Sequence, residues 1–388
     1  LAAISRRYRE RENHISSDSW PIYISLQKDG ILFKMRRTQD LPDKESATMF
    51  FQDCKLSHQA QITGISHSVK EILPPDLLDL TQLQKEANIR YGYTASEVYD
   101  IAQSLYEKKL ISYPRTSCRY LTEDVFDSLP PIMARLLSWE LFPAAKGTGG
   151  IDISNLSRHV INAEKANVHH AIIITGIRPG NLSEKEMQVY RLVAGRMLEA
   201  FMAPCRIETT NVEAVCAAQH FKAEQTRIIE AGWHDVFMRS DMVPKSGYSV
   251  NELPEVKKGD NLNVCGCNMV HKKELPVDPF TDAELVEYME LNGLGTVSSR
   301  TNIIRTLVNR KYIRYSGKYI VPTPKGMFTY ETIRGKKIAD TSLTADWEKQ
   351  LAGLESGMIT GQDFLNRIRT LAKEMTDDIF NTYSTKEE

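Results

Sequence analysis

Apolar and polar side chains alternate one by one in two stretches of the chain, and this pattern predicts half-buried β-strands. The first stretch begins near Ile22, turns at Asp29-Gly30, which is typical of a hairpin, and resumes at Ile31. Residues 59–69 also favour an extended chain. The second stretch covers residues 206–270 and is punctuated by Gly and Pro. A helical middle separates the two, so the simplest arrangement is one β domain into which the helical part is inserted.

The helical middle contains a helix-turn-helix pattern that ends in an extended segment. Leu80–Tyr91 has the composition and spacing of a helix. Thr94 and Glu97 have the spacing of a capping box, so a second helix is expected to begin there. That helix closes at two lysines, and Leu110–Tyr113 then favours an extended chain. Pro114 stops any further helix.

A similar unit is predicted near the C-terminus. Thr281 and Glu284 form another capping-box pattern, a turn follows at residues 292–295, and Ser298 or Ser299 is expected to cap the next helix. Two short apolar stretches around a Ser-Gly turn then predict a hairpin, which completes the pattern of a winged helix. Residues 105–113 and 307–315 align element for element. The patterns therefore predict two units suited to DNA, although two unrelated helical hairpins would also fit them.

The composition limits the class of protein. The 388 residues allow two to four domains with a sizeable core. The formal net charge is -1, so nucleic-acid binding would depend on local patches rather than on an overall field. No apolar run approaches the roughly 20 residues that a membrane helix needs, and we expect no membrane association. The chain begins with Leu1 and a basic stretch, so we expect it to be a piece of a longer protein.

The cysteines and the N-terminal arginines have ordinary interpretations. Six cysteines are scattered through the chain, which favours reduced thiols and a cytoplasmic location. Cys265 and Cys267 with His271 could form half a zinc site, but a second ligand pair is missing, so surface or buried thiols are expected. The four arginines between residues 6 and 11 could lie on a solvated helix end or could face phosphates.

Tyr113 is the candidate for covalent chemistry. Arg115 follows two positions later, and its planar guanidinium matches the oxygens of a phosphate. A tyrosine beside a phosphate-binding group is what phosphodiester transesterification needs, because the phenolate attacks phosphorus. Such a tyrosine can equally be a half-buried packing residue. His169 and His170 precede an apolar run, and either could bind a phosphate or help to activate the phenol, or could simply be structural.

Several long motifs, in one consistent order, are similar to those of type IA DNA topoisomerases. They are the segment 80–95, the run Ile-Ser-Tyr-Pro-Arg-Thr at 111–116 continuing to Arg119, the run His-His-Ala-Ile at 169–172, Gly-Leu-Gly-Thr at 293–296 with Ser299-Arg300, and Thr-Ala-Asp-Trp-Glu at 344–348. The doubled histidine is closer to the topoisomerase III branch. The resemblance spans almost the whole chain.

The resemblance implies a multidomain α+β fold. It would be an open arch that combines a β-rich arch domain with two helical domains of the winged-helix (CAP-like) kind. A DNA-gripping domain would combine residues 1–19 with 276–388, and the β-rich arch would combine residues 20–72 with 204–275. The nucleophile-bearing domain would be residues 73–203. The family's N-terminal metal-binding (Toprim) domain, with its glutamate and acidic cluster, has no counterpart in this sequence.

The resemblance also implies the reaction and the site. Tyr113 would cleave one DNA strand without ATP, through a 5′-phosphotyrosyl intermediate, and rejoin it after strand passage, with Arg115 and His169 as the other catalytic residues. DNA contacts would come from His170, Thr175, Ser299, Arg300 and Arg119. Magnesium would be the cofactor, on the absent domain, so we expect this isomerase fragment to be inactive alone. The expected partner is single-stranded or negatively supercoiled DNA, relaxed or decatenated by a monomer.

Two other classes of protein remain as alternatives. A non-catalytic winged-helix protein could bind single-stranded DNA and use Tyr113 only to stack on a base. A replication-type nickase would need a metal-binding histidine cluster beside its tyrosine, and a tyrosine recombinase would need several spaced arginines around it. Neither of the last two patterns is present.

Overall fold

The computed structural model describes residues 1–139, 141–142, 151–166, 169–238 and 245–384. Its N-terminal elements are α1 (Ala2–Glu12), β1 (Asp18–Ser19), β2 (Ile22–Lys28), β3 (Ile31–Arg37), α2 (Lys44–Leu56) and β4 (Gln59–Ile72). The middle contains α3 (Leu80–Tyr91), α4 (Ala95–Glu107), α5 (Glu123–Asp127), α6 (Leu129–Ser138), α7 (Glu184–Phe201), β5 (Cys205–Cys216), β6 (Gln219–Glu230) and β7 (Asn261–Met269). The remaining elements are β8 (Lys272–Lys273), α8 (Asp282–Leu291), α9 (Val297–Asn309), β9 (Ile313–Ser316), β10 (Tyr319–Pro322), α10 (Pro324–Ile333), α11 (Thr341–Glu355) and α12 (Gly361–Ser384).

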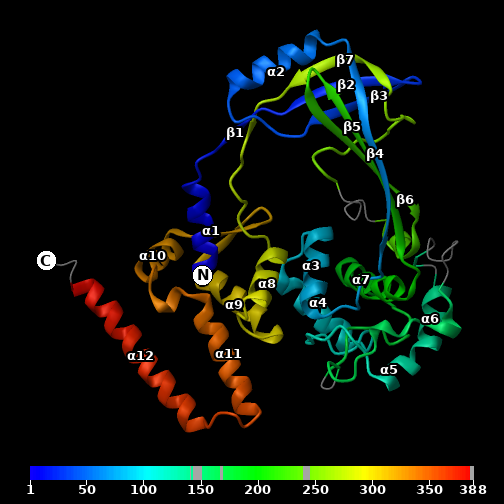
Figure 1. Cartoon of the computed structure of the whole chain (residues 1–388). Coiled ribbons are helices and arrows are strands. Elements are labelled where there is room, and N and C mark those ends of the chain that lie inside the picture. Colours follow the sequence, from blue (N-terminus) through cyan, green and yellow to red (C-terminus); the bar gives the residue numbers. More distant parts are fainter. Residues whose placement is uncertain (140, 143–150, 167–168, 239–244, 385–388) are drawn as a thin grey trace.

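These elements form an arch (Figure 1). A β-barrel lies at the top of the view, and two groups of helices lie side by side below it. The chain passes between barrel and helices on one side beside α1, and on the other side through the long strands β4, β5 and β6. An open space separates the barrel from the helices. The predicted open arch with one β-rich part and two helical parts is therefore confirmed.

Both predicted β-rich stretches contribute to the barrel. Its strand order is β2-β3-β6-β5-β4-β7, and all neighbouring strands are antiparallel. The alternation near the N-terminus has the predicted consequence, because Ile22, Ile24 and Leu26 are fully buried in the barrel core. Each such side chain stabilises the fold by roughly 1.5–3 kcal/mol through burial. The turn between β2 and β3 lies at Asp29 and Gly30, where the hairpin turn was predicted, and both residues have positive φ.

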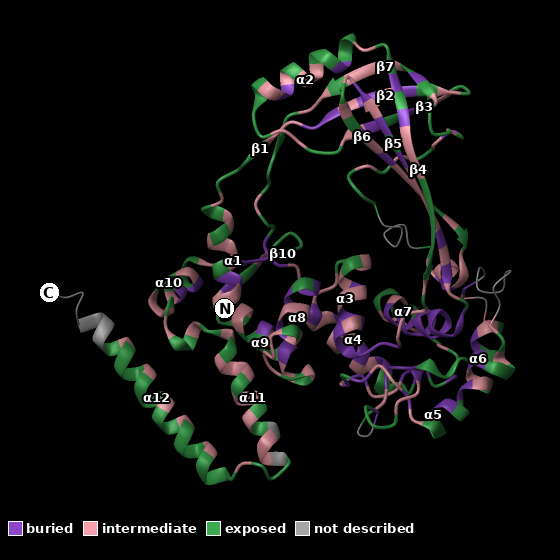
Figure 2. Ribbon diagram, viewed as in Figure 1, coloured by how far each residue is buried: buried purple, intermediate pink, exposed green. Residues whose placement is uncertain are grey.

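The helical middle has its own core, shown in purple in Figure 2. Leu80–Tyr91 and Ala95–Glu107 form helices as predicted, and Thr94 and Glu97 make the predicted capping box. The buried side chains of α3, α4, α6 and α7 share one hydrophobic cluster with residues 171–174. The start of β5 and Trp233 also pack into this cluster. The domain boundaries at residues 72/73 and 203/204 therefore stay a prediction.

The C-terminal unit follows the predicted order of helix, turn, helix and hairpin. Ile4 of α1 packs into its core together with residues of α8, α9 and the β9–β10 hairpin. The predicted cap of the second helix is wrong. Thr296 is the N-cap, and Ser299 is the third helical residue, whose side chain bonds back to the Thr296 N–H at 2.8 Å. The chain turns into the helix earlier than the serines suggested because Gly295 adopts a positive φ of 72°.

The second helix of each unit, α4 and α9, ends in the same way. In each, the residue after the helix cap is a lysine in the left-handed region, Lys109 with φ 59° and Lys311 with φ 60°. The Leu110 N–H then donates to Leu105 O at 2.9 Å, and the Tyr312 N–H donates to Leu307 O at 2.9 Å. The aligned sequence segments thus adopt matching backbone turns. Within the part of the chain that the structure describes, no helix is long and apolar enough to cross a membrane.

Candidate active site

Tyr113 lies on an extended segment that follows α4. The left-handed turn at Lys109 directs the chain away from the helix and alongside residues 171–174. Ile111 bridges Ile174 in antiparallel fashion, and the Ser112 N–H donates to Ile173 O at 2.8 Å. The Ser112 hydroxyl donates to Ala171 O at 3.1 Å and accepts from the Ile173 N–H at 2.9 Å. These bonds fix the backbone directly before Tyr113.

The ring of Tyr113 lies between two other rings. Tyr106, from the last turns of α4, packs edge-on against it with ring centroids 5.4 Å apart. His169 lies on another side, with ring centroids 4.7 Å apart and a 44° angle between the planes. Tyr113 itself is only half-buried, and His169 is exposed. A phenol beside an imidazole, both open to solvent, is accessible to a polymeric substrate.

Arg115 is held by the outer face of α4. Its Nη2 donates to Gln103 Oε1 at 3.2 Å, and its guanidinium carbon lies 5.0 Å from the centre of the Tyr99 ring. The Nε atom of Arg115 is buried and has no hydrogen-bond partner within the described structure. A buried N–H without a partner is unfavourable, so an anion that reached this group would gain a bond that the protein leaves unmade.

The two histidine positions lie on a strand-like segment beside Tyr113. The backbone carbonyl of His169 accepts from the Thr116 hydroxyl at 3.1 Å, which joins it to the segment of Tyr113. The Nδ1 atom of His170 lies 2.7 Å from Ala171 O, so Nδ1 must carry the proton there. Thr175 is exposed, and its hydroxyl donates to Lys109 O at 2.6 Å. The structure therefore brings all of these predicted residues to the neighbourhood of one segment.

Arg119 and Arg300 are placed differently, because both are bound within the protein. Arg119 Nε donates to the buried carboxylate of Asp79 at 2.6 Å, and its Nη2 lies 3.7 Å from Glu290. Arg300 Nη1 lies 3.6 Å from Glu290 and donates to the Thr81 hydroxyl at 3.3 Å. Burial lowers the pKa of Arg300, and the nearby carboxylates oppose this shift. These arginines join the two helical units.

Ser299 serves its own helix. Its hydroxyl accepts the Thr296 N–H at 2.8 Å as part of the capping box. It is half-exposed at the N-terminus of α9. A helix N-terminus favours anions, so the serine remains at a place where a phosphate could approach.

Sequence reasoning missed three residues of the site. Tyr99, Gln103 and Tyr106 lie on one face of α4, and they hold the side chains of Arg115 and Tyr113. Their spacing of four and three residues, which is one helical stripe, was the available signal. It could be found only after the helix and the turn that follows it were placed together.

The described residues offer no metal centre. Within them, no group of three or more His, Cys, Asp or Glu side chains could hold a metal ion. His271 stacks on Trp20 at 4.3 Å and its Nε2 lies 2.7 Å from Asp18, so it is not directed at Cys265 or Cys267. The thiols of Cys265 and Cys267 approach Gln27 Oε1 and Phe51 O instead. Within the described ranges, therefore, no set of side chains fits a magnesium or zinc site.

The sequence matches one protein family along most of its length. The family described as DNA topoisomerase matches residues 1–366. DNA topoisomerase 3 of Bacillus licheniformis is 31% identical over 344 residues, covering 82% of this chain and 47% of that protein. DNA topoisomerase 1 of Methanocaldococcus jannaschii is 30% identical over 390 residues, covering 100% of this chain and 49% of that protein. The chain thus spans about half the length of the curated relatives it matches.

A solved structure has a similar fold. Full-length topoisomerase I of Thermotoga maritima superimposes with a TM-score of 0.73 at 22% sequence identity. The match covers 96% of this chain and 61% of that protein.

Proposed function

This chain belongs to the type IA DNA topoisomerase family, and we propose that it carries the strand-cleaving half of such an enzyme's active site. The observation that carries the proposal is the placement of Tyr113. Its half-exposed ring lies between Tyr106 and His169, and Arg115 follows two positions later on the same segment. We infer that the substrate is single-stranded DNA or the melted region of negatively supercoiled DNA.

The proposed reaction exchanges one phosphodiester for another. The Tyr113 oxygen attacks a backbone phosphorus, an O–P bond forms, and the bond from phosphorus to the 3′ oxygen breaks. The phenol gives up its proton, and the 3′ oxygen takes one up. Tyr113 is then joined to the 5′ phosphate. Because an ester replaces an ester, the reverse step reseals the strand without ATP.

The residues of this chain have separate parts in that reaction. Arg115 binds the non-bridging oxygens of the phosphate and stabilises the charge that grows on them. Its buried, unpartnered Nε supports this role, because a bound oxygen would satisfy it. His169 orients the ring of Tyr113 and offers an imidazole within reach of the same phosphate.

The DNA strand would be held on both helical units. His170, Thr175 and Ser299 are the contacts that are open to solvent at least in part. Arg119 and Arg300 would have to release Glu290, which binds both of them, and take a phosphate in its place. Strand passage through the arch would then relax or decatenate DNA, with the protein acting as a monomer. We infer that the complete enzyme uses magnesium, which would be held outside the described residues, since no group of three or more His, Cys, Asp or Glu among them could hold a metal ion.

A non-catalytic protein that binds single-stranded DNA is the second candidate. Tyr106 is 39% exposed and packs on Tyr113, and such a pair of rings could stack on bases. In that case the phenol oxygen of Tyr113 would have no chemical part.

Covalent capture of DNA separates the two candidates. The full-length protein is incubated with a labelled single-stranded oligonucleotide, denatured, and assayed for DNA that remains attached. Tyr113→Phe removes only the attacking oxygen, so capture should fall by at least about 100-fold while DNA affinity is kept. Tyr106→Phe is the matched control, since it removes a neighbouring phenol oxygen, and it should capture normally. Undiminished capture by Tyr113→Phe would sink the proposal.

A further inference from the structure

Strand β3 has one edge that is only partly covered. Along one edge, Ile31–Arg36 pairs with β2. Along the other edge, β3 pairs with β6 only at Arg36 and Arg37. In the described structure, Ile31–Met35 has no strand partner on that second edge. The free N–H and C=O groups of such an edge can pair with another extended chain.

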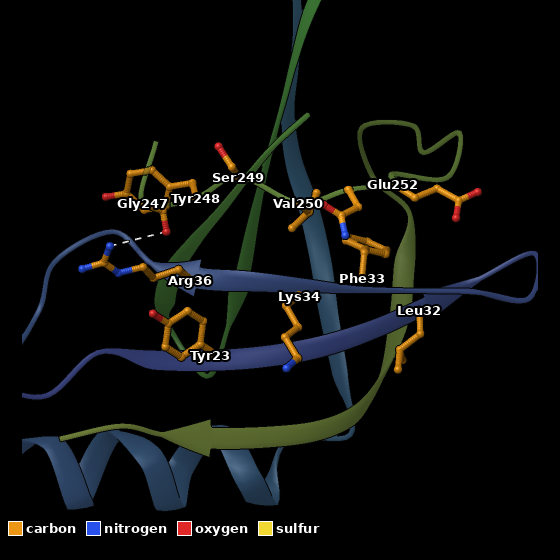
Figure 3. Close-up of a pocket in the computed structure, with 11 residues that line it drawn as sticks. Tyr23, Leu32, Phe33, Lys34, Arg36, Gly247, Tyr248, Ser249, Val250 and Glu252 are labelled. Atoms are coloured by element: carbon orange, nitrogen blue, oxygen red, sulfur yellow. Dashed lines mark hydrogen bonds between the residues drawn. The ribbon is translucent and has the colours of Figure 1, made fainter. Parts of the chain in front are cut away.

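A segment that we call the strap, residues 245–252, lies opposite this edge (Figure 3). The strap pairs with strand β6 of the barrel at one point. The Glu224 N–H donates to Tyr248 O at 2.9 Å, and the Val250 N–H donates to Glu224 O at 2.8 Å, so the two run parallel. The Tyr248 hydroxyl anchors the strap to Thr38 O at 2.9 Å. The strap therefore follows β6 and leaves β3 free.

A cavity of about 440 Å³ opens between β3 and the strap. Its lining includes Tyr23, Leu32, Lys34 and Arg36 from β2 and β3, and Tyr248 and Glu252 from the strap. The unpaired stretch Ile31–Met35 is roughly 16 Å long at the usual rise of a strand. The cavity thus offers a strand edge together with side chains that could select what binds there.

The charges along the edge favour acidic side chains. Lys34 is exposed and makes no ion pair within the described structure. Arg36 pairs with Asp40 and donates to Gly247 O at 3.4 Å, but its buried Nε has no hydrogen-bond partner among the described residues. Leu32, on the same outer face, is 59% exposed. Glu252 is the one carboxylate among the lining residues.

We propose that the β3 edge and the strap form a docking site for an extended peptide of a partner protein. The peptide adds as a strand to Ile31–Met35, so its side chains alternate between the barrel and the outer face. Its outward positions place an apolar residue opposite Leu32 and a carboxylate opposite Lys34. A second carboxylate, two positions further along the peptide, lies beyond the paired stretch and extends toward Arg36, whose own edge is taken by β6. A nucleic-acid strand fits less well, because its phosphates offer only acceptors and would leave the carbonyl groups of the edge unpaired. The site lies on the barrel and does not depend on the proposed reaction at Tyr113.

Two fluorescein-labelled peptides test the proposal with the folded protein. One carries Leu-Val-Glu-Val-Glu and the other carries the reverse order, since a strand can add in either direction. At least one should bind, and amide hydrogen exchange should slow within Ile31–Met35. Successive N–H groups of a strand point to opposite sides, so methylation of two successive peptide nitrogens removes one donor to β3 in whichever direction the peptide lies. The methylated peptide should bind roughly tenfold more weakly or worse. Lys34→Glu should weaken binding of the unmethylated peptide roughly tenfold. Lys349 is an exposed lysine on α11, and Lys349→Glu should leave peptide binding unchanged.

Three results would overturn the docking site. Neither peptide binds up to about 1 mM. The methylated peptide binds as tightly as its parent, which would mean that no strand pairing occurs. Oligothymidylate displaces the peptide and slows exchange in the same residues, which would make the surface one for nucleic acid. Circular dichroism and the Tm of Lys34→Glu verify that the variant is folded, so loss of binding reports on the site itself.

Discussion

The side chains around Tyr113 fix the direction of its ring without burying it. Tyr106 and His169 contact the ring, while Ser112 ties the backbone to residues 171–173. A ring that is held in place and still accessible suits a nucleophile that must meet a large substrate in one geometry, because a positioned group loses little entropy when it reacts. Arg115 is likewise held from behind by Gln103 and Tyr99.

Arg115→Lys tests whether the guanidinium binds the reacting phosphate. A lysine keeps the charge but loses the planar fork, and it cannot keep both the Gln103 bond and two phosphate oxygens. We expect the rate of oligonucleotide cleavage by the full-length protein to fall about 100-fold. Equilibrium affinity for the same oligonucleotide should change by no more than about threefold, because one phosphate contact among many is altered.

Arg135→Lys is the control for that variant, because Arg135 is exposed on α6, away from the α4 face that holds Arg115. It should cleave at the normal rate. Equal rates for Arg115→Lys and the unchanged protein would remove Arg115 from the proposed reaction.

At the scale of residues, the sequence named candidate site residues, which stay a prediction, but it did not indicate which side chains they bind within the protein. Tyr113, Arg115 and His169 were singled out, and the structure places Tyr113 and His169 in contact. It also shows Arg119 and Arg300 bound to Asp79 and Glu290, which no local pattern indicated. Ion pairs between residues far apart in sequence depend on how two helical units pack, and that packing is not written in either segment alone.

At the scale of elements, the helix ends position the site. The N-terminus of α7 is joined to the end of α4 by Glu186, which accepts from the Ser104 hydroxyl at 2.7 Å and from Lys108 Nζ at 2.5 Å. Glu186 also completes the capping box of α7 with Ser183. The turn at Lys109 comes directly after the residues that bind Glu186, and the segment that carries Tyr113 comes directly after that turn.

Glu186 should make stability depend on pH. The bond from Lys108, then those from Ser104 and the Ser183 cap, lower its pKa from 4.5 to about 2. Its ionised form therefore stabilises the fold fully above pH 4.5, and this contribution is lost as the pH falls toward about 2. Glu186→Gln should cost about 1 kcal/mol of unfolding free energy at pH 7. It should also flatten the dependence of stability on pH in that window.

Urea unfolding at several pH values measures this effect. Glu184→Gln is the matched control, since Glu184 is an exposed carboxylate in the same first turn of α7. It should keep the slope. If Glu186→Gln left the dependence of stability on pH unchanged, the hydrogen bonds of Glu186 would contribute nothing to the stability of the fold.

Capping-box patterns predicted where two of the helices begin, but other capped helices and some turns were not predicted from the sequence. The capping boxes at Thr94 and Thr281 gave α4 and α8 their starts. In contrast, α2 was not predicted, although Asp43 caps it through the Ser46 N–H. The turn between β5 and β6 consists of Ala217 and Ala218, both with positive φ, and alanine gives no turn signal. There the pairing of two long strands imposes the turn.

At the scale of the whole molecule, the arch keeps the β-barrel apart from the two helical units. The barrel and the helical units have distinct hydrophobic cores, joined by long strands and by the N-terminal segment. Contacts between the helical units include many polar pairs, such as Lys85 with Glu287 and Arg305 with Asp100. Polar interfaces of this kind separate at a lower cost than apolar ones, which is what strand passage would require.

The 388-residue chain on its own should bind single-stranded DNA without relaxing supercoils. The chain spans about half the length of the curated relatives it matches, and among its described residues no group of three or more His, Cys, Asp or Glu side chains could hold the magnesium that we expect the reaction to need. Agarose-gel relaxation of a negatively supercoiled plasmid, with and without magnesium, measures this. Robust magnesium-dependent relaxation by the chain alone would contradict the expectation.

The most direct test of the account identifies the amino acid that becomes attached to DNA. The full-length protein is reacted with a single-stranded oligonucleotide and denatured. Its proteolytic peptides are then searched by mass spectrometry for a nucleotide joined through its 5′ phosphate. The account predicts the adduct on the peptide containing Ile111–Thr116, at the oxygen of Tyr113. An adduct on Tyr106 or on any other residue, or a nucleotide joined through its 3′ phosphate, would contradict it.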